Sequence, residues 1–132
     1  MTEFFMAMIP PTVTHQEKKI RVVNGKPIVY EPYELKAARA KLTAHLARHK
    51  PEEKMRGPIE LSVTWCFPAK NGKPGWRITK PDTDNLQKLL KDCMTHVGFW
   101  KDDAQVCCET IKKIWNEIPG IFIQINQLDN DL

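Results

Sequence analysis

The chain has 132 residues, a formal net charge of +4, and a composition of 42% hydrophobic and 27% charged residues. This length suits one hydrophobic core and is short for two, so we expect a single domain over residues 1–132. The apolar runs are too short to cross a bilayer, and the N-terminus carries no signal-peptide pattern. The sequence therefore excludes a membrane-spanning protein and predicts a soluble one without a membrane partner.

The charges are distributed unevenly along the chain. Residues 1–80 carry fifteen Lys/Arg and seven Asp/Glu, a balance of +8, whereas residues 81–132 carry five and nine, a balance of −4. A nuclease requires such a division, because cations bind the phosphate backbone and carboxylates bind metal ions. An ordinary charged surface has the same totals, so the asymmetry alone identifies no function.

The four cysteines follow neither a zinc-binding spacing nor a disulfide framework. They are Cys66, Cys93, Cys107 and Cys108. We therefore expect reduced thiols, which are typical of a cytoplasmic protein. A free cysteine packs as a small hydrophobic residue.

The first predicted elements are a strand and a hairpin. Residues 2–8 indicate a strand that ends before Pro10-Pro11. Further on, Asn24-Gly25 separates two apolar runs, which is the strongest short signal for a β-hairpin, here over residues 20–30.

A helix is predicted over residues 33–49, with Pro32 at its first position and an alanine-rich sequence of high helix propensity. Its buried side is expected to carry Leu35, Ala38, Leu42, His45 and Leu46. His45 and His49 share a helical face, but no acidic or thiol residue at suitable spacing completes a metal site. We therefore interpret both as surface histidines.

Residues 59–67 alternate strictly between apolar and polar types, which predicts a strand with one buried face. Residues 68–80 then predict a loop that is rich in cations. Cations interleaved with an aromatic residue fit DNA binding through phosphate contacts and stacking. The alternative is a solubilising loop whose tryptophan packs on the core. The candidate DNA contacts are Lys70, Lys73, Trp76, Arg77 and Lys80.

The C-terminal third predicts a second helix and two strands. The helix precedes Gly98, a strand follows over residues 105–115, a turn over 116–120, and a last strand over 121–125. Together with the earlier elements, this order predicts an α+β fold with one mixed β-sheet and two main α-helices.

The stretch around the second helix holds five of the sixteen acidic residues, namely Asp82, Asp84, Asp92, Asp102 and Asp103. Asp82 or Asp84 can cap the helix through a side-chain oxygen. The apolar residues that follow have helical spacing and predict one buried face, consisting of Leu86, Leu89, Leu90, Cys93, Met94 and Val97.

The polar face of this helix presents Asp84, Lys88 and Asp92, one turn apart from one another. Clustered aspartates without histidine or cysteine favour Mg²⁺ or Mn²⁺, which can activate a water for attack on phosphate. Lys88 could neutralise charge on the phosphate in the transition state. Each part also has a structural interpretation, as a helix cap, an ordinary ion pair or a turn. Converging carboxylates would repel one another without a cation, which favours the metal.

The motif over residues 80–88, with Asp92 and the segment Trp-Lys-Asp-Asp-Ala-Gln-Val at residues 100–106, resembles the signature of the RusA family of Holliday junction resolvases. The resemblance implies a homodimeric, Mg²⁺-dependent endodeoxyribonuclease, often carried by a prophage. Such an enzyme nicks four-way junction DNA in recombination and repair.

By position, the resemblance implies that Asp82, Asp84 and Asp103 are metal-binding carboxylates and Lys88 is the catalytic lysine. The same pattern includes Asp102, Asp92 and Asn85 as possible additional site residues. Lys113 matches a recurrent family lysine and could meet the DNA substrate.

Two rival functions remain open on the sequence. The first is a DNA-binding module whose acidic cluster is structural. The second is a metal-dependent phosphatase, because an Asp-x-Asp pair also occurs in that chemistry, although the basic first 80 residues argue against it. For a homodimer, residues 4–6 and 121–125 are candidate interface strands, with a fully internal location as the alternative.

Overall fold

The computed structural model describes residues 1–14 and 19–129. The elements in chain order are β1 (Thr2–Met6), β2 (Lys19–Val23), β3 (Lys26–Tyr30), α1 (Tyr33–Ala47), β4 (Ile59–Pro68), the 3₁₀ helix η2 (Lys70–Gly72), β5 (Gly75–Trp76), α2 (Thr83–Val97), the 3₁₀ helix η3 (Asp103–Gln105), β6 (Val106–Asn116) and β7 (Gly120–Gln127). This confirms the predicted α+β fold with two α-helices and a mixed sheet in the described part of the chain.

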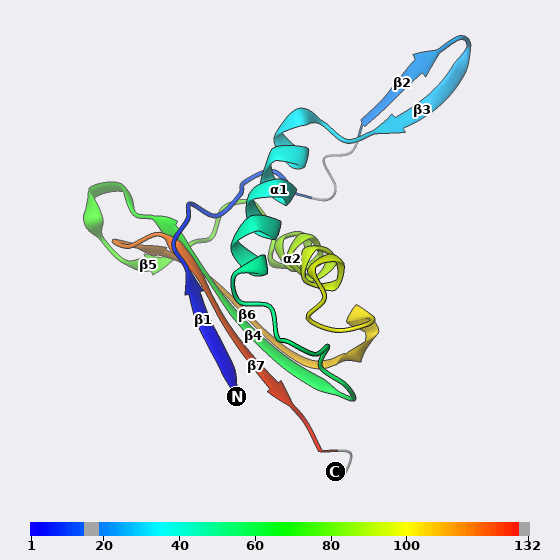
Figure 1. The fold of residues 1–132 in the computed structure, drawn as a ribbon. Helices are drawn as coiled ribbons and strands as arrows, with labels where there is room; N and C mark the ends of the chain where they lie inside the picture. Colours follow the sequence, from blue (N-terminus) through cyan, green and yellow to red (C-terminus); the bar gives the residue numbers. More distant parts are fainter. Residues whose placement is uncertain (15–18, 130–132) are drawn as a thin grey trace.

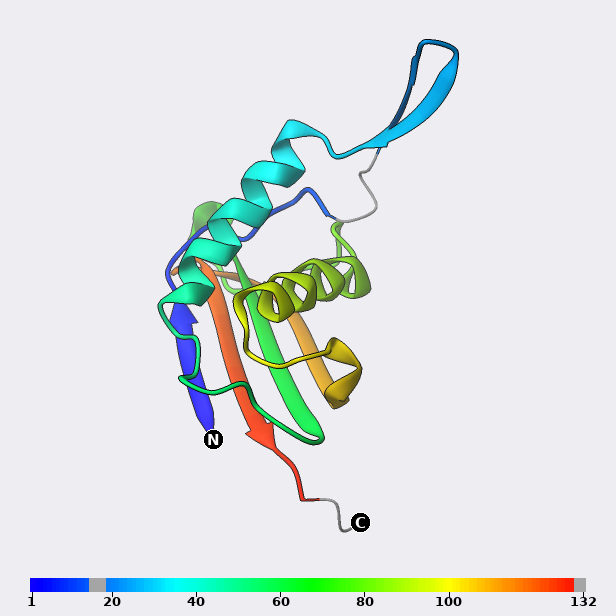
Figure 2. The same ribbon diagram turned by 45° about the vertical axis from the view of Figure 1, so that its right-hand side comes forward.

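The main sheet has the strand order β1-β7-β4-β6-β5. Its central pair, β4 and β6, is parallel, and the connection between these two strands contains α2. The other neighbours are antiparallel. Both helices cover the same face of the sheet (Figure 1 and Figure 2). The strand–helix–strand crossover therefore lies at the centre of the fold and brings one side of α2 close to β6.

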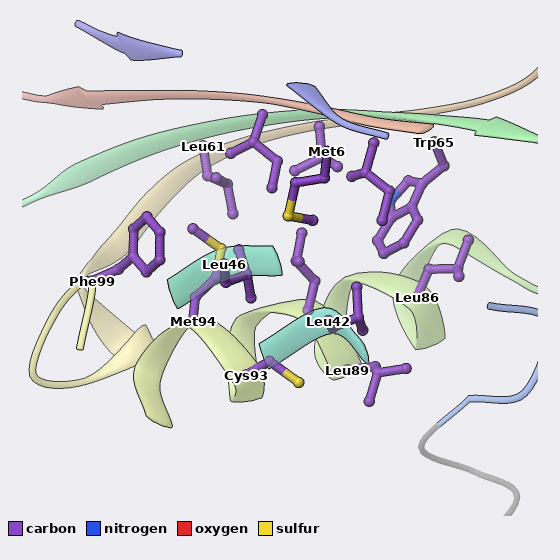
Figure 3. Close-up of a cluster of buried hydrophobic side chains, with 14 of the residues drawn as sticks. Met6, Leu42, Leu46, Leu61, Trp65, Leu86, Leu89, Cys93, Met94 and Phe99 are labelled. Atoms are coloured by element: carbon purple, nitrogen blue, oxygen red, sulfur yellow. The ribbon is translucent and has the colours of Figure 1, made fainter. Parts of the chain in front are cut away.

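The core lies between this face of the sheet and the two helices. Alternate residues of β4 are buried at 0–1% exposure because every second side chain points to the helix side, namely Ile59, Leu61, Val63, Trp65 and Phe67. Figure 3 shows Leu42 and Leu46 of α1 and Leu86 of α2 among these side chains. Burial of one such side chain contributes about 1.5–3 kcal/mol to folding.

The first helix agrees with its prediction except at its ends. Pro32 is the N-cap, so the first helical residue is Tyr33, and the helix ends at Ala47 because Arg48 is its C-cap. Leu35, Leu42 and Leu46 are fully buried, while Ala38 and His45 are half-buried.

The ring of His49 stacks on that of Phe4 with 4.3 Å between centroids, so this histidine packs against β1. The expectation that it is a surface residue was therefore wrong, because β1 lies beside the end of α1.

Two further expectations need correction, and one of the two alternatives for Trp76 is excluded. The first strand ends at Met6, not at residue 8. Residues 68–80 are not one loop, because they contain η2 and the edge strand β5, which is too short to show a periodic pattern. Trp76 is 70% exposed, so its side chain does not pack on the core.

The isoleucines of β7 do not form an exposed edge that could supply the candidate dimer contact. Ile121, Ile123 and Ile125 are 0–2% exposed, because β7 is an internal strand between β1 and β4. On β1, Met6 is buried as well, whereas Phe5 is 40% exposed. The fully internal alternative applies to the isoleucines.

The predicted hairpin is confirmed and forms a separate two-stranded sheet. Asn24 and Gly25 have positive φ angles of 52° and 76°, which the tight turn between β2 and β3 requires. Figure 1 shows the hairpin projecting away from the rest of the molecule.

All four cysteines are free thiols, as expected. Two of them, Cys66 and Cys93, are buried, and burial raises the pKa of both thiols. Within the described ranges, no helix has the length and apolar character needed to span a membrane.

Candidate active site

The second helix begins directly after Asp82. The backbone carbonyl of Asp82 accepts a hydrogen bond from the Leu86 N–H at 3.1 Å, but its side chain makes no capping hydrogen bond. The predicted side-chain cap is therefore wrong for Asp82, although the residue occupies the N-cap position. Its carboxylate is exposed at the positive end of the helix dipole, and Asp84 follows in the first turn.

An open pocket of about 340 Å³ lies where α2 faces β6. Its walls come from α2, η3 and β6, and the lining residues are Asp84, Gln87, Lys88, Lys91, Asp103, Glu109 and Ile111. The pocket thus brings together Asp84, Lys88 and Asp103, which are up to 19 positions apart in the sequence. These three were candidates from the motif, and the fold gathers them at one place.

Glu109 is a pocket residue that sequence reasoning missed. It pairs with Leu61 in the β4–β6 register, so its side chain lies on the helix side of the sheet, as does that of Ile111 beside Val63. Its carboxylate forms an ion pair with Lys91, with 3.3 Å between Oε1 and Nζ. The available signal was the alternation along β6, which places residues 109 and 111 on one face.

Gln87 is a second residue that sequence reasoning missed. It is 2% exposed although it lines the pocket. Its Oε1 accepts a hydrogen bond from Trp65 Nε1 at 3.3 Å, whereas its Nε2 has no hydrogen-bond partner. The amide therefore connects the core to the floor of the pocket.

The neighbours Asp102 and Asp103 have different environments. Asp102 caps η3, because its carboxylate accepts a hydrogen bond from Ala104 N at 2.9 Å. In return, Gln105 Oε1 accepts from Asp102 N at 3.1 Å, which completes a capping box. Gln105 also donates to the carbonyls of Met55 and Gly57. Asp102 thus fixes the turn, and Asp103 lines the pocket.

Asp92 lies away from the pocket. It lines a groove between α1 and α2 together with Arg39, Cys93 and His96. Its link to the pocket is Lys88, whose Nζ is 3.8 Å from Asp92 Oδ1. The Lys88 side chain is 59% exposed, so this pair is weak and leaves the ammonium accessible to solvent.

The donor set of the pocket suits a hard divalent cation. Asp84, Asp103 and Glu109 offer carboxylate oxygens, the ligands that Mg²⁺ and Mn²⁺ prefer, and the open mouth admits water and phosphate. Among the described residues, no three acidic, histidine or cysteine side chains lie close enough together to hold a metal ion unaided. A bound ion would therefore draw on water or substrate oxygens, as Mg²⁺ commonly does.

Two of the cations predicted to contact DNA have intramolecular partners. Lys113 Nζ donates to the carbonyls of Thr79 at 2.6 Å and Pro81 at 2.7 Å. Burial, with a smaller contribution from the charge of Arg77, lowers the pKa of Lys113, and the carboxylate of Asp82 opposes this. Lys113 therefore holds the segment that leads into α2.

Arg77 also holds this segment. Its guanidinium lies 4.2 Å from the centroid of the Phe67 ring and 4.5 Å from that of Trp115, and it donates to the carbonyl of Lys80. Burial lowers the pKa of Arg77. A DNA contact by Arg77 or Lys113 stays a prediction, but both side chains already position the backbone before Asp82.

The remaining candidates in this segment face solvent. Lys70, Lys73, Trp76 and Lys80 are exposed. Lys70 and Lys73 also line an open cavity of about 490 Å³ that continues to Trp115. Residues 70–80, the basic segment, thus present accessible ammonium groups at the edge of the sheet where β5 pairs with β6.

An α+β domain with an open, carboxylate- and lysine-lined pocket beside a basic segment has the features of a nuclease. The family model for endodeoxyribonuclease RusA matches residues 9–126. The chain therefore belongs to the RusA family of crossover junction endodeoxyribonucleases, whose nucleases are metal-dependent.

Individual relatives support this assignment. The chain is 34% identical over 135 aligned residues to the crossover junction endodeoxyribonuclease rusA of Lactococcus phage r1t, with 96% of both chains covered. It is 28% identical over 118 residues to the uncharacterized protein YqaN of Bacillus subtilis, covering 80% of this chain and 82% of the relative. RusA of Escherichia coli K12 is 37% identical over 49 residues, about a third of each chain.

Proposed function

We propose that this protein hydrolyses phosphodiester bonds in four-way junction DNA, with Mg²⁺ as its ion and Mn²⁺ as a substitute, during recombination and repair. The observation that carries this proposal is the pocket shared by Asp84, Lys88 and Asp103 in a chain of this family. A helix and a separate 3₁₀ turn supply these side chains, so their meeting is a property of the fold and not of sequence proximity.

The carboxylates are the proposed metal ligands. Asp84 and Asp103 line the pocket, Asp82 is exposed two residues before Asp84, and Glu109 is a further oxygen donor on the pocket wall. The ion, when bound, would supply an activated water and stabilise the leaving oxygen. Asp102 acts indirectly, because its cap holds the turn that carries Asp103.

Lys88 is the proposed catalytic lysine. Its ammonium is accessible at the pocket and forms a weak ion pair with Asp92. In this position it would contact a phosphate oxygen and neutralise the charge that develops during hydrolysis. Asn85 is half-buried in the same helical turn and does not line the pocket, so its proposed role is secondary.

Lys70, Lys73, Lys80 and Trp76 are the proposed DNA contacts next to the pocket. Their side chains are exposed and cationic or aromatic, which suits phosphate binding and base stacking. The free thiols fit a reducing compartment such as the cytoplasm. The similarity to a phage protein over almost the whole chain supports a prophage origin.

The active form is proposed to be a homodimer. Resolution of a junction needs two nicks in strands of like polarity, and the described part of one chain offers a single pocket lined by Asp84, Lys88 and Asp103. Two-fold symmetry would supply the second pocket in matching orientation. Of the candidate interface residues, Phe5 on the edge strand β1 is the accessible one. Sedimentation at micromolar concentration tests the stoichiometry, and a monomer that makes both nicks in one encounter would refute it.

The decisive experiment compares a synthetic four-way junction with a linear duplex of the same sequence. We expect Mg²⁺-dependent nicking of the junction, no nicking of the duplex, and loss of activity with chelator. Junction binding that survives chelator without cleavage under Mg²⁺ or Mn²⁺ would favour the DNA-binding module. Turnover of a chromogenic phosphate ester would favour the phosphatase.

A further inference from the structure

The hairpin β2–β3 stands apart from the main sheet and has two different faces. Its strands have five residues each and pair only with each other among the described elements. At about 3.4 Å per residue they extend about 17 Å. Figure 2 shows the hairpin leading into α1 and projecting from the molecule on the side where α2 begins.

One face of the hairpin is cationic. In the register Arg21 lies opposite Ile28, and Lys26 lies opposite Val23, so both cations share one face. Both are exposed, and Arg21 lies 5.2 Å from the centroid of the Tyr30 ring. Residues 19–30 contain three Lys/Arg and no acidic residue, so the arm has no internal counter-charge.

The other face is apolar and uncovered. It consists of the pairs Ile20–Val29 and Val22–Pro27. Ile20, Val22 and Val29 are 67%, 72% and 64% exposed. An isolated two-stranded hairpin is only marginally stable in water, and a strip of exposed aliphatic side chains normally marks a binding surface. The hairpin therefore has the composition of an arm that binds a partner.

We propose that this hairpin is a second DNA contact, which lies in a groove of one duplex arm of the junction. The inference rests on the proposed function. A two-stranded ribbon fits the major groove with its aliphatic face toward the sugars and thymine methyl groups, while the long Arg21 and Lys26 side chains on the outer face would reach the phosphates that flank the groove. The choice of DNA over a second copy of this chain follows from charge, because the chain has a net charge of +4 and its first 80 residues a balance of +8.

The length of the hairpin predicts how much duplex it covers. About 17 Å of strand corresponds to about five base pairs at 3.4 Å per base pair. The contact lies outside the branch point, so it requires arms that extend beyond the pocket. Junctions with long arms should use the hairpin, and junctions with arms of only a few base pairs should not.

The test measures affinity in Ca²⁺, to prevent cleavage, for junctions of one core sequence with long or short arms. The variant Arg21→Gln/Lys26→Gln should bind long-armed junctions about tenfold more weakly than the wild type, with a salt slope reduced by about two. With short arms the two proteins should bind alike. The matched control Arg48→Gln/Lys50→Gln removes the same two residue types from the opposite end of α1, where both are exposed, and should behave as wild type.

A second variant, Val22→Ser/Val29→Ser, tests the apolar face at unchanged charge. It should lose affinity for long arms while its sedimentation coefficient and melting temperature match the wild type. Unchanged affinity of both hairpin variants, or an equal loss at both arm lengths, would overturn the inference. Dissociation of a dimer by the Val22→Ser/Val29→Ser variant would overturn it in favour of a protein contact. The proposed function is tested separately, by cleavage in Mg²⁺. If neither the wild type nor any variant cleaves the junction, the proposed function is refuted, while the binding measurements in Ca²⁺ still decide whether the hairpin contacts DNA.

Discussion

Two neighbouring regions of the molecule use charged side chains in opposite ways. In the pocket, Asp84, Lys88 and Asp103 line an open cavity, and Lys88 has only a weak ion pair. Arg77 and Lys113 donate hydrogen bonds to three backbone carbonyls of the segment before α2, and both side chains are partly desolvated. The first group is available to metal and substrate, whereas the second group determines where the first turn of α2 lies.

This difference shows that charge and position in a motif do not define the role of a residue. Lys88 carries its ammonium group on α2 itself, and Lys113 of β6 binds the segment that leads into α2. Lys113 binds two backbone carbonyls and supports the segment before α2, whereas Lys88 is the side chain that we propose to meet substrate. Substitutions that change the two groups separately can test the distinction.

The largest effect is expected from the three proposed metal-binding aspartates, which are Asp84 and Asp103 in the pocket and Asp82 at the N-cap of α2. Asp82→Asn, Asp84→Asn or Asp103→Asn should each reduce junction cleavage by about a thousandfold or more, because a neutral amide binds a hard cation poorly. Folding and junction binding should stay intact, since removing one of several like charges relieves repulsion. Asp129→Asn is the matched control, because Asp129 is exposed in the segment after β7 and does not line the pocket. Near-normal cleavage by any two of the first three variants would refute the ligand assignment.

A smaller loss is expected for Lys88→Ala, about a hundredfold in the rate of cleavage under single-turnover conditions. Affinity for the junction should change little, because the contact is made mainly in the transition state. Lys88→Arg should restore only part of the rate, since a planar guanidinium differs from a compact ammonium. Weakened binding with an unchanged rate would instead make Lys88 a simple phosphate contact.

The supporting group should respond through stability. Lys113→Met removes two hydrogen bonds to carbonyls and should lower the free energy of unfolding by about 1–2 kcal/mol. Cleavage should fall about tenfold through misplacement of Asp82, with no change in the salt dependence of binding. Lys112→Met removes the same charge on the other face of β6, where the side chain is exposed, and should be close to neutral. A reduced salt slope for Lys113→Met alone would show that Lys113 contacts DNA.

Much of the fold could be predicted because its signals are local. The alternation of β4, the Asn24-Gly25 turn and the apolar face of α2 each determine an element within a short window of sequence. The edge strand β5 was missed because two residues show no period, and it forms only through pairing with Trp115 and Ile114. The internal position of β7 depends on strand order, which no local pattern reveals.

The candidate site was predictable to a similar degree. The motif named the three pocket residues Asp84, Lys88 and Asp103, but Glu109 required knowledge of which face of β6 meets α2. The different roles of Asp102 and Asp103 depend on the capping box with Gln105, and adjacent aspartates look alike in sequence. The structural roles of Arg77 and Lys113 arise from hydrogen bonds to backbone carbonyls. For Lys113 the acceptor Thr79 is 34 residues away in the sequence, so no local pattern could reveal the contact.

The smallest effect is expected from the exposed cations beside the pocket. Lys70→Gln/Lys73→Gln should weaken binding to all DNA only a few-fold and reduce the salt slope by about two, because each phosphate contact adds about 0.9 to the slope. Arg77 stays unchanged in this variant, since its substitution would disturb the segment before α2. Trp76→Ala, at an exposed indole, should leave the salt slope as it is and lower the preference for a junction over a duplex. If the double variant keeps the wild-type salt slope, the DNA does not run along this segment. The exposed cations would then not be DNA contacts, and the proposed distinction between accessible and supporting cations would be wrong for them.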